Sequence, residues 1–364
     1  MKDFFQDKRV LVTGCCGTVG HELVRQLLTE YQVPELVGLD NNESELFFLE
    51  QRFLEFSGSH FFLADVRDKD KLARKLNGVD IVFHTAAFKH VVLCERSPYD
   101  AVQTNILGVQ NLVQAVNEAG VAKAIFTSSD KAVNPTNVMG TSKLMGERLM
   151  TAANSNQRGQ GPVFASTRFG NVLGSRGSVI PIFREQIKKG GPITLTDPEM
   201  TRFIMSIRQA VQLVIDSAAL AQGGEVFVTK MPVIRIKDLA EVMINELASG
   251  YGYKPEEIGI KIIGTKPGEK LYEELMTGEE TRRTLELSRY FAVTPAFSSL
   301  YKEVAYEYPE VLSQQVDNPY NSANEEVMGQ EELREFLYSN KLLEGEAGEG
   351  FEPDRRFWGD EKEE

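Results

Sequence analysis

Three side chains that can exchange protons follow one another at Ser129, Asp130 and Lys131, and a second lysine follows at Lys143. An adjacent carboxyl and amine can act on one substrate as a general acid and a general base. Ordinary Lys and Asp titrate near ~10.4 and ~3.9, so both would be in the unreactive state at neutral pH. Burial and nearby positive charges would lower the pKa of Lys131, and burial would raise that of Asp130, whereas an ion pair between them would oppose both shifts. The plainer alternative is a charged pair on a surface turn.

A glycine-rich segment, Gly14-Cys15-Cys16-Gly17-Thr18-Val19-Gly20, could hold phosphate groups. It lies between an apolar run and an amphipathic stretch, where glycines permit a tight turn and a pyrophosphate can approach the N-terminus of a helix. Asp40 ends the next apolar run and could accept a hydrogen bond from a ribose 2′-hydroxyl, which favours NAD over NADP. A strand-end cap is the alternative role for Asp40. The expected cofactor-binding residues are Gly14, Gly17, Thr18, Val19, Gly20, Asp40, Asp65, Val66, Ala86, Ala87, Lys89, Asn105 and Lys143.

Short apolar runs alternate with amphipathic stretches up to about Arg168. Each run is too short for a helix and predicts a strand that is buried on both faces. The repeated strand–helix–strand spacing predicts an α/β fold with a doubly wound parallel sheet of the Rossmann type, whose ligands lie beyond the carboxyl ends of the strands. The apolar runs are residues 10–12, 36–39, 61–63, 81–83, 124–126 and 163–165.

After Phe169 the alternation loosens, which predicts a smaller C-terminal α/β substrate-binding region. We therefore expect an NAD-binding domain over residues 1–169, completed by strands and helices from later in the chain. Residues 170–300 would form most of the substrate-binding region, and 301–364 a C-terminal extension with an acidic tail.

The composition argues against several classes of protein. The net charge is −13 and no basic face is evident, which argues against a nucleic-acid partner. The three cysteines, Cys15, Cys16 and Cys94, lack metal-ligand spacing, so we expect no metal and reduced thiols. The first residues carry charges where a signal peptide would be apolar, and no apolar run reaches the ~18 residues of a membrane span. These features predict a cytoplasmic protein without a membrane partner.

Four motifs carry a resemblance to a known family. They are Ser-Asp-Lys-Ala-Val-Asn-Pro at 129–135, Arg-Phe-Gly-Asn-Val-Leu-Gly-Ser-Arg-Gly at 168–177, Thr-Asp-Pro-Glu-Met-Thr-Arg-Phe at 196–203 and Lys-Pro-Gly-Glu-Lys at 266–270. Up to about residue 290 the chain resembles the extended short-chain dehydrogenases that act on nucleotide sugars, and most closely the UDP-N-acetylglucosamine 4,6-dehydratases of bacterial polysaccharide and glycan biosynthesis. In the wider superfamily a catalytic Tyr stands where this chain has Met139. Some dehydratases of the family also resemble this chain in carrying Met at this position. A thioether cannot transfer a proton, so the sugar's 4-hydroxyl needs another base.

The resemblance implies bound NAD, a UDP-sugar substrate and a homodimer or higher homo-oligomer. The implied reaction oxidises C4 of the sugar, removes water across C5 and C6, and returns the hydride to C6. For this reaction we expect Ser129 to contact the 4-hydroxyl, Lys131 to be the C5 base and Asp130 to be the C6 acid, with Met139 replacing the Tyr and Lys143 holding the nicotinamide ribose. The expected substrate-binding residues are Lys89, Asn171, Arg176, Arg202 and Lys270.

Two other functions remain as alternatives. A nucleotide-sugar 4-epimerase or simple oxidoreductase needs no acid–base pair at 130 and 131, and usually needs the absent Tyr. A non-catalytic NAD-binding sensor is favoured by Met139 and opposed by the presence of Lys143 and the cluster at 129–131. Within the dehydratase interpretation, GDP is the alternative nucleotide, and these residue types fit either retention or inversion at C5.

Overall fold

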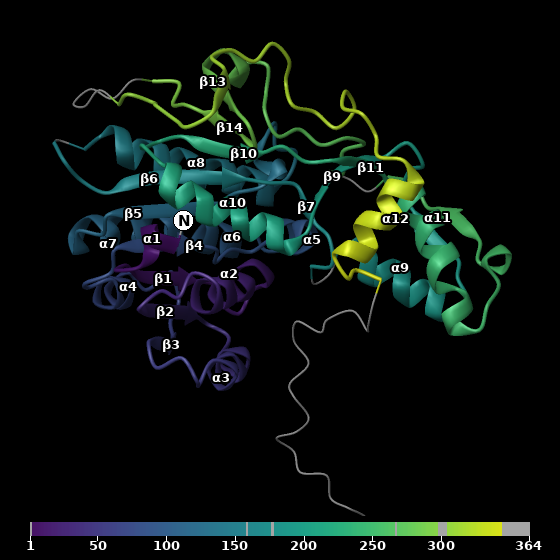
Figure 1. The fold of residues 1–364 in the computed structure, drawn as a ribbon, viewed down its shortest axis with the longest axis horizontal. Coiled ribbons are helices and arrows are strands. Elements are labelled where there is room, and N and C mark those ends of the chain that lie inside the picture. Colours follow the sequence, from purple (N-terminus) through teal and green to yellow (C-terminus); the bar gives the residue numbers. More distant parts are fainter. Residues whose placement is uncertain (1, 158, 176–177, 266–267, 298–303, 344–364) are drawn as a thin grey trace, which may run out of the picture.

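A ten-stranded sheet forms the centre of the molecule, with the order β15-β13-β14-β10-β6-β5-β4-β1-β2-β3 (Figure 1). The computed structural model describes residues 2–157, 159–175, 178–265, 268–297 and 304–343. Each expected apolar run forms a strand, and neighbouring strands from β3 to β10 run parallel, which confirms the doubly wound α/β fold. The first strands are β1 (Arg9–Thr13), β2 (Glu35–Asp40), β3 (Ser59–Leu63), β4 (Ile81–His84), β5 (Lys123–Thr127) and β6 (Val163–Arg168).

Strand β3 corrects one expectation, because it is not buried on both faces. It is the edge strand of the sheet, and its Phe62 and Leu63 side chains are exposed. The ammonium of Lys75 lies 3.1 Å from the centroid of the Phe62 ring. The Lys75 side chain therefore covers part of the Phe62 ring at this edge of the sheet, although β3 has no second buried face.

Helices cover both faces of the sheet. Helix α2 packs against α10 on one face, and α4, α7 and α8 form the layer on the other. Helix α8 begins where the Asn137 side chain accepts a hydrogen bond from the backbone N–H of Gly140 at 2.8 Å. The helices of these layers are α1 (Lys2–Phe5), α2 (Thr18–Thr29), α3 (Glu43–Arg52), α4 (Lys69–Lys75), α5 (Val91–Arg96), α6 (Pro98–Ala101), α7 (Gly108–Ala119), α8 (Val138–Ser155) and α10 (Ile207–Leu220).

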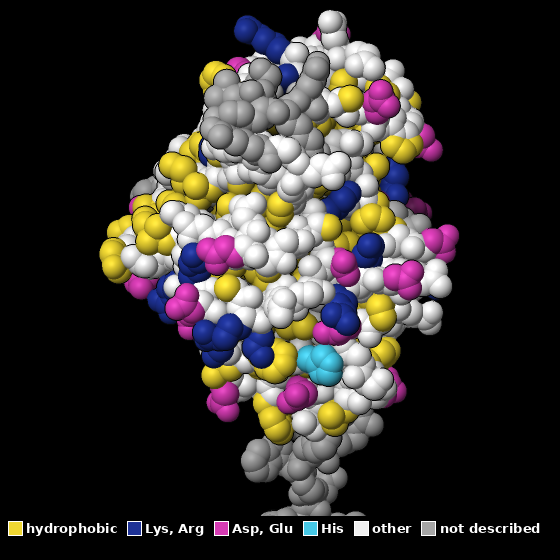
Figure 2. All heavy atoms as spheres, turned by 90° about the vertical axis from the view of Figure 1, so that its left-hand side faces the viewer, with side chains coloured by type: hydrophobic (Ala, Val, Ile, Leu, Met, Phe, Trp, Pro, Cys, Tyr) yellow, Lys and Arg dark blue, Asp and Glu magenta, His cyan; other side chains and the backbone are white. Residues whose placement is uncertain are grey.

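A π-helical turn, η1 (Val102–Leu107), joins α6 to α7. Along this stretch Val109 is buried in the core, while Val102 is exposed. On the face at the left of Figure 1, Lys and Arg side chains are intermixed with Asp and Glu (Figure 2).

The expected homodimer or higher homo-oligomer stays a prediction.

The chain after residue 169 extends the large sheet and also builds a second hydrophobic core. Strands β10, β13, β14 and β15 extend the large sheet, while a separate core forms around α9, α11 and α12. The remaining strands are β7 (Asn171–Val172), β8 (Ile193–Leu195), β9 (Thr201–Met205), β10 (Val226–Thr229), β11 (Val233–Arg235), β12 (Ile260–Ile262), β13 (Thr284–Leu287), β14 (Tyr290–Val293) and β15 (Val311–Ser313). The remaining helices are α9 (Val179–Lys188), α11 (Ile236–Leu247) and α12 (Gln330–Ser339), with short 3-10 turns at η2 (Asp130–Ala132), η3 (Ser249–Tyr251), η4 (Pro255–Glu257) and η5 (Glu280–Arg283).

Within the described residues, no helix combines the length and the apolar character that a membrane crossing requires.

Candidate active site

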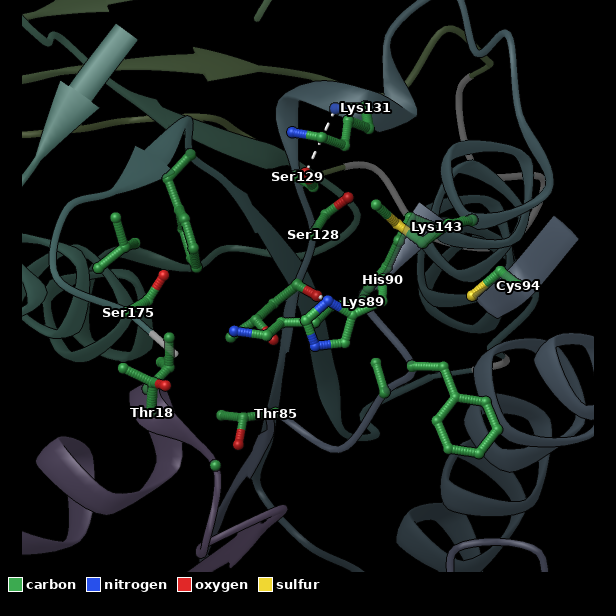
Figure 3. A pocket seen from close by; sticks show the side chains of 18 of the residues that line it. Thr18, Thr85, Lys89, His90, Cys94, Ser128, Ser129, Lys131, Lys143 and Ser175 are labelled. Carbon is green, nitrogen blue, oxygen red and sulfur yellow. Dashed lines mark hydrogen bonds between the residues drawn. The ribbon is translucent and has the colours of Figure 1, made fainter. Parts of the chain in front are cut away.

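Two adjoining cavities lie beyond the carboxyl ends of the parallel strands. The first, of about 770 Å³, is lined by the start of α2, the segment after β5 and the first turns of α8. In Figure 3, Thr18 lies toward one end of this cavity, and Ser129 and Lys131 lie toward the other. The second cavity, of about 450 Å³, is lined by Arg202, Lys270 and parts of α9. Asp130, Lys131 and Asn171 line both cavities, so the expected reactive residues stand where the two meet.

The glycine turn has the geometry that a pyrophosphate requires. Gly14 has a φ of +70°, and a Cβ there would lie 2.6 Å from the backbone nitrogen of Ala86. A Cβ on Gly20 would lie 2.1 Å from the carbonyl oxygen of Gly14. Helix α2 starts after Gly17 without a side-chain cap, and its N-terminal residues Gly17, Thr18, Val19 and Gly20 line the first cavity. These features fit a dinucleotide cofactor.

Asp40 lies beside this turn, at the end of β2. Its carboxylate accepts hydrogen bonds from the backbone N–H of Cys16 at 2.9 Å and of Asn42 at 3.0 Å. Both bonds fix its orientation and leave lone pairs for a ribose hydroxyl. Cys15 and Cys16 approach Asp40 closely enough to hold a metal ion, but burial raises the pKa of the Cys15 thiol and disfavours the thiolate that a metal would need.

The remaining residues expected at the cofactor differ in what they contact. Ala87 and Lys89 line the first cavity. Asp65 is held by Arg67 at 2.6 Å, and this guanidinium lowers the pKa of Asp65 to about 2. Val66 is part of the core beneath α7. Asn105 is buried and bonds both Phe88 and Ser142, so it ties the loop after β4 to α8.

The reactive segment is a buried turn and not a surface pair. Ser129 precedes the 3-10 turn η2, and its hydroxyl donates to Asp130 Oδ1 at 2.6 Å. Lys131 Nζ lies 2.9 Å from Asp130 Oδ2, with Asp130 4% exposed and the Lys131 side chain 33% exposed, toward the cavities. A Cβ on Gly140 would lie 2.1 Å from the Lys131 carbonyl oxygen, so α8 packs directly against this turn.

The ion pair sets the protonation of this turn. Burial alone would raise the pKa of Asp130, but Lys131 and the Ser129 hydroxyl outweigh it and lower that pKa. Burial would also lower the pKa of Lys131, but Asp130 and Glu273 outweigh it and raise that pKa. Burial thus acts on both residues in the expected direction, but the ion pair, which was expected to oppose it, decides the net pKa shift of each.

Met139 and Lys143 stand on the first turns of α8. Met139 is buried against Cys94 and Ala101 and lines the first cavity. Lys143 donates to the carbonyl oxygen of Thr127 at 2.9 Å, and burial lowers its pKa to about 8. His84, on β4 behind them, is fully buried and bonds Thr13, as expected of a core histidine.

Glu273 is a site residue that sequence reasoning did not find. It lines the second cavity, is 5% exposed, and its Oε1 lies 3.9 Å from Lys131 Nζ. Asn171 donates to Glu273 Oε1 at 2.9 Å, and Arg202 Nε lies 3.2 Å from the same oxygen. Two residues expected to bind substrate thus also hold Glu273 in place.

Of the other expected substrate residues, Lys89 lines the first cavity and Lys270 lines the second. Lys270 Nζ donates to the Val133 carbonyl oxygen at 3.0 Å and to Glu274 at 3.3 Å. Arg176 lies outside the described residues.

Comparisons with known proteins agree with this architecture. Residues 10–295 match the family model described as polysaccharide biosynthesis protein. An uncharacterized membrane protein of Methanocaldococcus jannaschii is 54% identical over 81% of this chain and 88% of its own length. The X-ray structure of Pen from Bacillus thuringiensis superposes with a TM-score of 0.85 and 40% identity, over 94% of this chain and 100% of that chain.

Curated relatives with named activities include both dehydratases and epimerases. An inverting UDP-N-acetylglucosamine 4,6-dehydratase of Campylobacter jejuni is 36% identical, over 82% of this chain and 86% of that protein. A UDP-glucose 4-epimerase of Rickettsia felis is 35% identical, over 94% of this chain and 98% of that protein. The chain belongs to the polysaccharide biosynthesis protein family of the extended short-chain dehydrogenases.

Proposed function

We propose that this protein is an NAD-dependent nucleotide-sugar 4,6-dehydratase, a lyase, and that its substrate is UDP-N-acetylglucosamine. One observation carries the proposal: a carboxyl and an amine, Asp130 and Lys131, are bonded at 2.9 Å where two cavities meet. Removal of water across C5 and C6 needs such an acid and base together, whereas 4-epimerisation changes C4 alone. Identity does not choose between these reactions, because relatives of both names are about equally similar.

NAD would be held by the glycine turn, Asp40 and Lys143, and when bound it supplies the oxidant that takes the hydride from C4 and returns it to C6. Lys143 presents its ammonium beside the cavity that the glycine turn lines, where a ribose hydroxyl can bond it. Met139 contributes packing and no proton at this position.

Asp130 can serve twice in the proposed reaction. In its ionised form it receives the proton of the 4-hydroxyl through Ser129, whose hydroxyl already bonds Asp130 Oδ1 at 2.6 Å. In its protonated form it then delivers this proton to the departing C6 hydroxyl. Lys131, as the neutral amine, takes the C5 proton and, after its N–H protons exchange with solvent, delivers one of them to C5. The chain thereby replaces the absent Tyr with a serine–aspartate pair.

We place the diphosphate of the substrate in the second cavity. Arg202 and Lys270 line its wall, where each is paired with a carboxylate, Glu273 or Glu274, that a diphosphate would have to displace or share, and Asn171 adds an amide donor. A UDP group is proposed here because the named dehydratase relative acts on a UDP-sugar.

Proton NMR of UDP-N-acetylglucosamine with the protein in D₂O tests this function. We expect a new C6 methyl signal with deuterium at C5, and the ring couplings will report retention or inversion. Interconversion of the C4 epimers without a methyl signal would indicate an epimerase. No reaction with UDP-, GDP- or dTDP-sugars would contradict an enzymatic function and favour a sensor.

The ribose role of Asp40 gives a separate prediction. Asp40→Ala should weaken NAD binding by about 10-fold to 100-fold, because a hydrogen bond to a charged group contributes ~1.5–3 kcal/mol. Titration calorimetry with NAD and NADP measures the effect, and the preference for NAD should shrink with it. Glu55→Ala, which removes an exposed carboxyl beyond α3, is the control. Unchanged NAD affinity in Asp40→Ala would rule out the ribose contact.

A further inference from the structure

The proposed base is held in its unreactive form by its neighbours. Lys131 can remove the C5 proton only as a neutral amine, yet its Nζ lies 2.9 Å from Asp130 and 3.9 Å from Glu273. Protonation of Asp130 by the 4-hydroxyl would neutralise the nearer of these two carboxyl partners. The ammonium proton of Lys131 then needs an acceptor inside the site.

We infer that Glu273 is this acceptor, a positioning residue that takes the Lys131 proton after C4 oxidation and returns it at the end of each turnover. This inference rests on the proposed dehydratase function. Among the described carboxylates, Asp130 and Glu273 are the two that lie within 4 Å of the Lys131 ammonium. Asp130 serves as the acid in the proposed reaction, so Glu273 is the carboxylate that remains to accept the Lys131 proton.

The proton count closes over one cycle. The 4-hydroxyl proton passes through Ser129 and forms the O–H bond of Asp130. A Lys131 N–H bond then breaks and a Glu273 O–H bond forms, which leaves a neutral amine. During elimination Asp130 gives its proton to the C6 oxygen, and the amine takes the C5 proton and then delivers one proton, exchangeable with solvent, to C5. Finally Glu273 returns its proton to Lys131, and every group regains its first state without any gain or loss of electrons.

The surroundings of Glu273 suit a carboxyl that changes its protonation. Arg202 Nε at 3.2 Å, Asn171 at 2.9 Å and the backbone N–H of Phe203 at 3.2 Å support the ionised form. Burial opposes that form and, in the resting site with Asp130 ionised, raises the pKa of Glu273 to about 8 together with the Asp130 charge. Transfer from Lys131 replaces an ammonium at the cavity wall and a buried carboxylate by two neutral groups, which the burial of Glu273 favours.

The pH dependence follows from the sign of this shift. Glu273 accepts a proton only when ionised, so the accepting fraction grows as the pH rises through about 8. We expect the elimination rate to rise over the same range. The other charged groups facing Glu273 are Asp130, whose pKa is lowered, Lys131, whose pKa is raised, and Arg202. Lys143, whose pKa is also about 8, would give a falling limb instead, because it loses its charge as the pH rises.

Glu273→Gln separates a proton acceptor from a bystander. In single turnovers with UDP-N-acetylglucosamine in D₂O, we expect reduced-nicotinamide absorbance to appear as in the wild type, while deuterium exchange at C5 slows about 100-fold. The rise in rate through about pH 8 should disappear. If the Glu273 charge acted only by holding Lys131 protonated, the neutral variant would exchange C5 faster. Wild-type or faster exchange would overturn the inference.

Controls keep this result distinct from misfolding and from failure of the proposed function. Glu279→Gln removes an exposed carboxyl paired with Arg283 and should leave both steps and the pH profile unchanged. Glu273→Asp keeps a carboxyl but moves it away from Lys131, so C5 exchange should be slower than in the wild type and still rise with pH. This variant decides the question if Glu273→Gln does not fold, and wild-type exchange in it would overturn the inference. If the wild type forms no 6-deoxy-4-keto sugar, the proposed function itself fails.

Discussion

Lys131→Ala is expected to bind NAD normally and to lose exchange of the C5 proton, with dehydration slowed about 100-fold to 10,000-fold. The effect is large because, among the described residues, Lys131 supplies the amine that stands at the meeting point of the two cavities. The glycine turn and Asp40 are unchanged, so cofactor affinity should be retained. Ser129 and Asp130 also remain bonded, so oxidation at C4 should still occur.

Proton NMR in D₂O and cofactor titration together measure this prediction. Lys131→Met keeps an unbranched side chain and tests whether lost packing explains the Ala result, because it should be equally inactive at C5. Lys69→Ala, which removes an exposed lysine paired with Glu118, serves as the control with wild-type exchange. Persistent C5 exchange in a folded Lys131→Ala protein would remove Lys131 as the base and leave a different group to be identified.

The sequence predicts the frame of the site because strand periodicity and glycine spacing are local properties. The apolar runs before Gly14, Asp40 and Ser129 each form a parallel strand of the large sheet, so the motifs that follow them lie along the same edge. Whether a strand lies in the middle or at the edge of a sheet depends on the whole fold and not on its own residues. Phe62 and Leu63 are exposed because β3 ends the sheet, which its own composition does not reveal.

Protonation and long-range partners could not be predicted in the same way. Glu273 reaches Lys131 and Arg202 only after the chain folds over the sheet edge, and as an isolated glutamate it resembles a surface residue. Residues 271–276 follow the Lys-Pro-Gly-Glu-Lys motif of 266–270. The apolar character of Leu275 and Met276, both fully buried in the fold, was the available signal that this part of the chain enters the interior. The pKa directions of Asp130 and Lys131 depend on the 2.9 Å contact, because burial and the ion pair act in opposite directions.

The same segment is anchored by a fully buried arginine. Arg168, at the end of β6, is 1% exposed and donates to Glu147 at 2.7 and 3.0 Å and to Glu280 at 3.1 Å. It also donates to the Leu275 carbonyl oxygen at 2.8 Å. One guanidinium therefore joins β6, α8 and η5 and fixes the backbone two residues beyond Glu273.

Arg168→Ala should lower the free energy of unfolding by about 3–5 kcal/mol, because two buried carboxylates would lose their partner. Chemical denaturation at neutral pH measures this change, and Arg168→Lys should restore only part of it, since an ammonium cannot bond both carboxylates in fork geometry. Arg208→Ala removes an exposed pair with Glu30 and should change stability by no more than about 1 kcal/mol. Equal losses in the two variants would show that Arg168 is no anchor.

The pH dependence of the stability lost in Arg168→Ala shows whether the charge or the packing of the arginine is responsible. Burial alone would raise the pKa of Glu280, but Arg168 outweighs it and lowers that pKa. A carboxyl with a lowered pKa in the folded state contributes stability that is complete above its unfolded pKa and is lost as the pH falls. The difference between wild type and Arg168→Ala should therefore shrink in acid. A difference that stays constant with pH would assign the loss to packing of the arginine side chain instead of its charge.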